Sequence, residues 1–104
     1  MELLIITAAR EFEKDIKLLL KRTQVKAFSY LDVTGYKDVS NEPMSANWFA
    51  SSAGEHQSVL FYAFVQKDLV KEVMVEIKEV NSRTESLSKV HVAVMDIKTT
   101  NGLW

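Results

Sequence analysis

The chain has 104 residues, of which 47% are hydrophobic and 26% are charged, and this composition is typical of one globular domain rather than of a disordered chain. Its formal net charge of -1 provides no basic field that would hold nucleic acid or an anionic membrane. Cysteine is absent, which excludes disulfides, thiolate metal ligands and cysteine nucleophiles.

The first segment, residues 1–8, is apolar but lacks the basic start of a signal peptide, and charged residues follow at once. We interpret residues 3–8 as a short apolar strand and expect a cytoplasmic protein that does not insert into a membrane.

Four apolar residues then follow at i, i+4, i+7 and i+8, namely Phe12, Ile16, Leu19 and Leu20. This spacing places them on one helix face and predicts a first helix over about residues 10–23.

The remaining elements follow from the same patterns. Runs rich in β-formers predict the second and third strands at residues 27–36 and 58–65. A second helix is indicated by inward-facing apolar positions at helical spacing: Leu69, Val70, Val73, Met74, Ile77 and Val80. We expect a polar loop at residues 81–88 and a last strand at residues 90–97. The order β-α-β-β-α-β, in the α+β class, is the ferredoxin-like arrangement, with residues 1–104 as one domain.

Two of the predicted strands are apolar on both faces. Residues 3–6 and 59–65 do not alternate between apolar and polar, although a sheet with one face in water should alternate. A second cover over the open sheet face is therefore expected, and another subunit could supply it. The alternative is a tightly packed monomer whose strands are simply hydrophobic.

Twenty mostly polar residues, 38–57, separate the second and third predicted strands. Loops of this length in a small domain are usually functional or disordered, and we expect a flexible segment here. Within it, Asn47 precedes two adjacent aromatic residues, Trp48 and Phe49. Such aromatics either anchor a partner protein or pack onto the chain's own oligomer, and the terminal Trp104 carries the same two alternatives.

From Leu4 to Lys37 the chain resembles the first half of PII-like signalling proteins, with an opening strand, an amphipathic helix and a segment ending in Val33-Thr34-Gly35-Tyr36. The long T-loop of that family lies between strands two and three, where residues 38–57 lie. Lys89 resembles the lysine that ends the family's B-loop. The resemblance implies a homotrimer that binds a small ligand between its subunits and signals through the loop to a partner such as a membrane transporter.

The resemblance also implies site residues. The ligand would be held by a wall of Phe28 and Ser29, a loop root of Gly35, Tyr36 and Lys37, and charges from Arg83 and Lys89, with Trp48 and Phe49 contacting the partner. Core packing remains the alternative for Phe28, as does a solvated position for the two lysines. Residues 83–89 (RTESLSK) lack the glycine-rich B-loop whose amides approach ATP phosphates, so sensing of ATP and 2-oxoglutarate is not implied.

Two other functions stay open. A metal-responsive protein of CutA type, linked to heavy-metal efflux, would use Glu55, His56 or His91. Because the two histidines lie 35 positions apart, a metal site would need copies of the same histidine from symmetry-related subunits. A small dimeric monooxygenase would use Asn47, Trp48 and His56. Because no catalytic motif is present, we expect no enzyme. The sequence requires no cofactor, and a nucleotide and a divalent metal remain the candidate ligands.

Overall fold

The computed structural model describes residues 1–37 and 54–102. Its elements, in chain order, are β1 (Glu2–Ala9), the 3-10 helix η1 (Arg10–Phe12), α1 (Glu13–Arg22), β2 (Ser29–Lys37), β3 (Gly54–Val65), α2 (Lys67–Arg83) and β4 (His91–Asp96). The predicted order β-α-β-β-α-β is confirmed. The predictions for Asn47, Trp48, Phe49 and Trp104 concern residues outside the described part of the chain.

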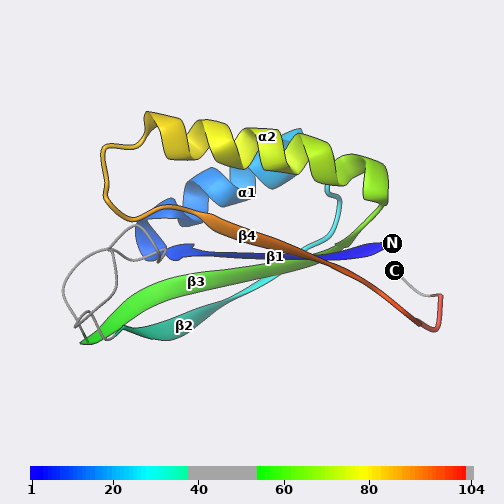
Figure 1. The fold of residues 1–104 in the computed structure, drawn as a ribbon, viewed down its shortest axis with the longest axis horizontal. Helices are drawn as coiled ribbons and strands as arrows, with labels where there is room; N and C mark the ends of the chain where they lie inside the picture. The colour runs from blue at the N-terminus through cyan, green and yellow to red at the C-terminus, as the bar shows by residue number, and fades with distance from the viewer. Residues whose placement is uncertain (38–53, 103–104) are drawn as a thin grey trace.

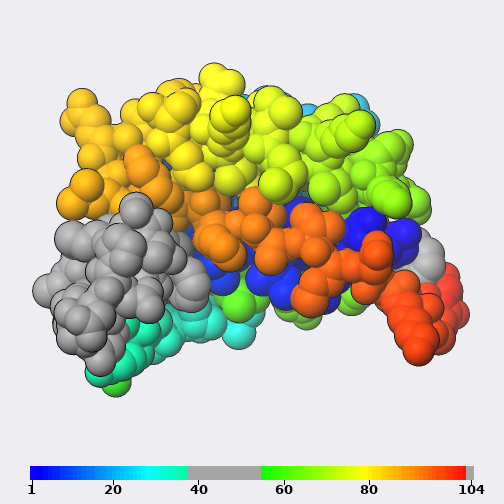
Figure 2. Space-filling model, in the orientation of Figure 1, coloured from blue at the N-terminus to red at the C-terminus, as the bar shows by residue number. Residues whose placement is uncertain are grey.

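The four strands form one antiparallel sheet in the order β2-β3-β1-β4. Both helices cover the same face of this sheet, with α2 running above α1 in the view of Figure 1. The predicted ferredoxin-like fold is therefore confirmed. The space-filling view shows β4 crossing beneath α2, with residues 97–102 extending beyond the sheet (Figure 2). None of the helices in residues 1–37 and 54–102 has the length and apolar character needed to cross a bilayer.

The core lies between the sheet and the helices. Alternate residues of β1 and β3 are buried on the helix side, as are the apolar positions of both helices that recur at helical spacing. The buried helix residues are Phe12, Ile16, Leu19, Leu20, Val73, Ile77 and Val80. Each was predicted as inward-facing from spacing alone, because the periods of helix and strand decide which side chains share a face.

The clearest differences from the predictions are two element boundaries and the facing of one side chain. β3 begins at Gly54, so residues 54–57, expected to lie in the loop, pair with residues 34–37 of β2. The second helix continues through Arg83, so the loop expected from residue 81 begins at Thr84. Met74, predicted to face inward, is 44% exposed. In the first two cases main-chain hydrogen bonds extend an element into polar sequence, where composition carries little signal.

The end of α1 is defined by its backbone hydrogen bonds. Gln24 has a positive φ of 66°, the left-handed conformation common just after a helix. The amide of Gln24 donates to Lys21 O at 3.1 Å and that of Val25 to Leu20 O at 2.9 Å. This pair of bonds is the Schellman arrangement, and the buried side chain of Val25 completes it. The chain is thereby turned toward β2.

The face of the sheet away from the helices is apolar. Cross-strand partners form rows on it, including Met95–Leu3–Phe64 and Ala93–Ile5–Tyr62. Four of its large side chains are exposed in one subunit: Leu31, Tyr62, Phe64 and Met95. The buried hydroxyl of Thr7, in the adjacent row, has no hydrogen-bond partner among the residues described. The predicted absence of alternation in β1 and β3 thus corresponds to a real apolar surface.

Two carboxyl groups meet where β1 and β4 pair. Glu2 is buried and lies directly across from Asp96. A hydrogen bond between their side chains raises the pKa of Glu2 above its ordinary value of 4.5; burial and the negative charge of Asp96 act in the same direction. The positive charges of Lys67 and of the N-terminus oppose these effects. Glu2 is therefore protonated more readily in the folded chain than in the unfolded chain.

This raised pKa gives a pH-dependent stability with a defined sign. Below 4.5 Glu2 is protonated in both states, and as the pH rises the unfolded chain loses the proton first. Folding stability is then expected to fall as the pH rises from 4.5 through the raised pKa of Glu2 in the folded chain, and to level off above that pKa. Glu2→Gln removes this dependence. The free energy of unfolding of the variant minus that of the wild type, measured in urea, should therefore be larger at about pH 7 than at about pH 4. An equal difference at both pH values would contradict the raised pKa of Glu2.

Candidate functional site

A cleft of about 410 Å³ lies where the end of β1 meets β3 and the loop before β4. Its volume is in the range of small-ligand pockets. The lining residues come from three separate parts of the chain: Ala9, Arg10, Glu11, His56, Gln57, Ser86 and Ser88. We call it the β1–β3 cleft. It lies between the start of β3 and the loop before β4, which takes the place of the B-loop in the resemblance to PII-like proteins.

That loop is held by side chains rather than shaped by glycine. Asn81 forms two bonds with Val90, since its amide nitrogen donates to the Val90 carbonyl at 2.9 Å and its Oδ1 accepts from the Val90 amide at 2.8 Å. The amide of Ser86 donates to Thr84 Oγ1, and that of Ser88 to Ser86 Oγ, each at 3.1 Å. Local hydroxyl-to-amide bonds of this kind stabilise turns. These bonds position the two serines that line the cleft.

Lys89 is fixed at the C-terminal end of α2. Its half-buried side chain donates to the carbonyl oxygens of Asn81 at 3.2 Å and Thr84 at 3.5 Å. A cation is stabilised there by the helix dipole. Lys89 is therefore not the freely solvated lysine of the alternative interpretation. Its ammonium is held beside the loop that carries Ser86 and Ser88.

The predicted loop root lies at the same end of the sheet. Gly35 pairs with His56, Tyr36 with Glu55, and Lys37 with Gly54. Tyr36 is exposed, whereas Lys37 is only 4% exposed, so the solvated alternative for Lys37 is wrong. Its Nζ finds no hydrogen-bond partner within the described chain. A buried ammonium in this state is unfavourable unless an anion or acceptor meets it.

The other predicted ligand residues lie elsewhere in the single subunit. Phe28 and Ser29 are at the opposite end of β2 from the loop root. Phe28 packs against the core, with its ring centroid 5.8 Å from that of Phe61. Arg83 lines a separate depression of about 280 Å³ beside Phe12. One subunit therefore brings the loop root and Lys89 toward one end of the sheet and leaves Phe28, Ser29 and Arg83 elsewhere. The residues that line the β1–β3 cleft include none of these predicted ligand residues.

The predicted metal ligands do not form a group of three within the parts of the chain described. His56, in β3, lines the β1–β3 cleft, and its neighbour Glu55 is exposed. His91 is the first residue of β4 and pairs with Thr7 on the open sheet face. Both histidines take part in interactions within the chain.

Sequence reasoning missed most of the cleft lining. It did not single out Arg10, Glu11, Gln57, Ser86 or Ser88. Arg10 carried the only available local signal, because it is a charged residue placed directly after an apolar strand, where strand ends present functional groups. The two serines carried none, because their position depends on the bonds made by Thr84 and Ser86 itself.

No protein-family model and no curated protein matches the chain. Solved structures do. CPII, a nitrogen regulatory PII-like protein from Thiomonas intermedia K12 bound to ADP, AMP and bicarbonate, superimposes with a TM-score of 0.69 at 17% identity, over 98% of this chain and 94% of CPII. The structure of CPII bound to ADP, AMP and acetate has a TM-score of 0.67 at 16% identity, and the match covers 92% of this chain and 84% of that one.

A DUF3240 family protein from Shewanella baltica OS155 is similar to the same degree, with a TM-score of 0.68 at 15% identity over 99% of this chain and 96% of that one. At these identities the similarity is one of fold. The chain therefore has the divergent PII-like fold that its sequence resembles.

Proposed function

We propose that this chain is a PII-like regulatory protein that binds an adenine nucleotide in the β1–β3 cleft, and that the cleft is completed by neighbouring subunits of a homotrimer. The observation that carries the proposal is the cleft in which the end of β1, the start of β3 and the loop with Ser86 and Ser88 meet. The loop root pairs with β3 at this end of the sheet, and the fixed ammonium of Lys89 follows Ser88 in the chain. The ADP and AMP bound by CPII, which shares the fold, support the ligand class.

Two lysines near this end of the sheet are suited to an anionic ligand, whereas Arg10 and Glu11 in the cleft lining carry opposite charges. Lys89 provides an ammonium held in place by two carbonyls, and Lys37 provides a second, buried one without an acceptor among the described residues. Lysine acts as a point charge toward phosphate. Ser86 and Ser88 add hydroxyl groups at the lining. In this proposal these groups replace the glycine-rich loop that the sequence lacks.

The open sheet face supports the trimer. Its exposed rows of Leu31, Tyr62, Phe64 and Met95 form the kind of apolar surface that marks an interaction site. A neighbouring subunit would cover these rows and would bring groups of its own to the cleft, which explains how Phe28, Ser29 and Arg83 could act in ligand binding although they lie apart in one subunit. Residues 38–57, with Trp48 and Phe49, would then report the bound state to a partner such as a transporter.

The proposal is tested by the change in melting temperature on adding ligand to the wild-type chain and to Lys89→Ala. ADP, AMP and ATP form one panel, and Cu²⁺, Zn²⁺, Co²⁺ and Ni²⁺ form the other. A ligand that binds only the folded state raises its melting temperature. We expect shifts with ADP or AMP that shrink in Lys89→Ala and persist in Lys78→Ala, a control at an exposed position on α2.

The comparison uses the ligand-induced shift of each variant, so that a change in stability without ligand does not enter it. Shifts with metals but not with nucleotides would favour the metal-responsive alternative and overturn the proposal. An equal nucleotide shift in wild type and Lys89→Ala would show that Lys89 is not a binding residue.

A further inference from the structure

Arg10 stands between two depressions of the surface. It is the first residue of η1, directly after β1, and it lines the β1–β3 cleft. It also lines a groove of about 770 Å³ on the other side, between the start of α1 and the edge strand β2. The groove residues are Arg10, Glu11, Glu13, Lys14, Tyr30, Leu31 and Asp32. The side chain of Arg10 can therefore serve either depression.

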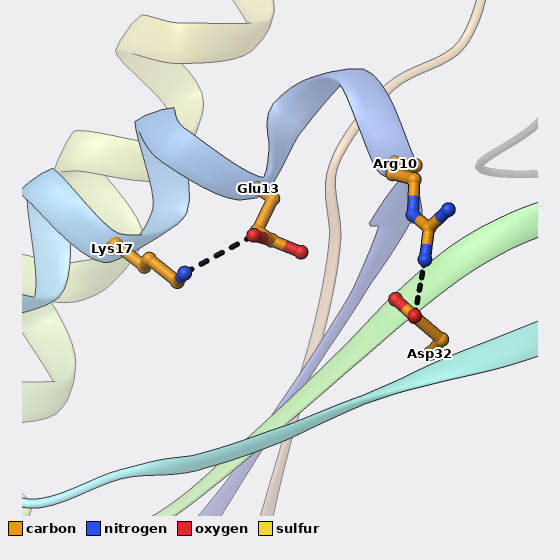
Figure 3. A network of polar contacts seen from close by, with 4 residues as sticks. All are labelled: Arg10, Glu13, Lys17 and Asp32. Atoms are coloured by element: carbon orange, nitrogen blue, oxygen red, sulfur yellow. Dashed lines mark hydrogen bonds and ion pairs between the residues drawn. The ribbon is translucent and has the colours of Figure 1, made fainter.

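In the structure the guanidinium of Arg10 is directed to the groove, where it donates a hydrogen bond to the carboxylate of Asp32 on β2 (Figure 3). The two side chains are 53% and 54% exposed. An exposed ion pair of this kind contributes little stability, because water screens it and both side chains must be held in one geometry. The pair is thus easily exchanged for a stronger one.

The neighbouring Lys17 is more firmly held. Its Nζ donates to Glu13 at 3.1 Å (Figure 3). The same Nζ lies 4.2 Å from the centre of the Tyr30 ring. Interaction with Tyr30 and Glu13 raises the pKa of Lys17, and it does not line the β1–β3 cleft. Arg10 is the cation that lines the cleft itself, and its planar guanidinium matches phosphate with two parallel hydrogen bonds.

We propose that Arg10 is a ligand-binding residue that exchanges the Asp32 carboxylate for a phosphate of a nucleoside diphosphate in the β1–β3 cleft, so that Asp32 acts as a latch that limits affinity in the free protein. This inference rests on the proposed function of the cleft. Ligand binding would release Asp32 on the edge strand β2, which leads to the loop root. The latch therefore links the occupied cleft to the strand that carries the signalling loop.

A double-mutant cycle tests the latch, with ADP affinity measured by calorimetry on the full chain. Asp32→Asn frees Arg10 and should tighten ADP binding about two- to fivefold, the range that an exposed ion pair implies. Arg10→Gln should weaken binding by about tenfold, as expected for loss of a charge-assisted hydrogen bond. In the Arg10→Gln background, Asp32→Asn should have no further effect. Asp32→Glu keeps the carboxylate and should bind ADP like the wild type.

The cycle separates the latch from a general effect of charge. If Asp32→Asn tightens binding equally with and without Arg10, removal of a negative charge explains the change and the latch is wrong. The latch is also wrong if the wild type binds ADP and neither substitution alters the affinity, and the proposed function then stands. If neither the wild type nor Asp32→Asn binds ADP, both proposals fail. Circular dichroism of each variant without ligand checks that the fold is kept.

Discussion

Replacing Phe61 with alanine is expected to lower the free energy of unfolding by about 3–5 kcal/mol. Phe61 is 1% exposed and pairs with Ile6 of β1 on one side and with Tyr30 of β2 on the other. Its ring stacks on that of Tyr30 with centroids 5.2 Å apart. Truncating the side chain leaves a cavity, which cannot close because β3 is held between β1 and β2. Because small domains are stable by only about 5–15 kcal/mol, the loss is a large fraction of the total.

Urea unfolding at fixed protein concentration measures this loss, with Leu18→Ala as the control. Leu18 is also apolar but is exposed on α1, away from the sheet, so its truncation should change stability by less than about 0.5 kcal/mol. A Phe61→Ala variant no less stable than Leu18→Ala would contradict the strand register that places Phe61 in the core.

Replacing Phe64 with glutamate is expected to convert the proposed trimer to monomers. Phe64 is three residues along β3 from Phe61 and faces the opposite side of the sheet. It is 47% exposed in one subunit. Its ring meets the Tyr62 ring edge-on, with the two ring centroids 6.4 Å apart. In an assembly it would be covered, and a carboxylate buried there without a partner is strongly unfavourable. In a monomer the same carboxylate would meet water.

Sedimentation analysis distinguishes these cases, with Val75→Glu on the outer surface of α2 as the matched control, since Val75 is also apolar and exposed. The wild type and the control should sediment at about three times the chain mass of 11.9 kDa, and Phe64→Glu should sediment as a single chain with an unchanged circular dichroism spectrum. A monomeric wild type would show that the open face needs no second subunit.

The boundaries of the strands illustrate how far local pattern reaches. The apolar spacing of Ile16, Leu19 and Leu20 predicted a helix face that the structure buries completely, because that spacing is a property of neighbouring residues. Residues 54–57 carry no such pattern, yet they form the start of β3. Their structure comes from pairing with β2, and main-chain pairing does not depend on the polarity of the side chains.

The candidate site was predictable only in part. The family pattern singled out Lys89 and the loop root, and the structure holds Lys89 on helix carbonyls beside the cleft. Arg10 and Ser86 were not predicted, because they lie 76 positions apart and share a cleft only after β1, β3 and the loop before β4 are assembled. No local spacing encodes that meeting.

By itself, the sequence determined the order of the elements, their inward faces and the presence of a sheet with two apolar sides, since each of these follows from periods of 3.6 and 2 along the chain. Tertiary structure alone decided that Lys37 is buried and that Arg10 is paired with Asp32 between two depressions. The reason is that burial and charge pairing depend on which distant strands become neighbours, and strand register sets this.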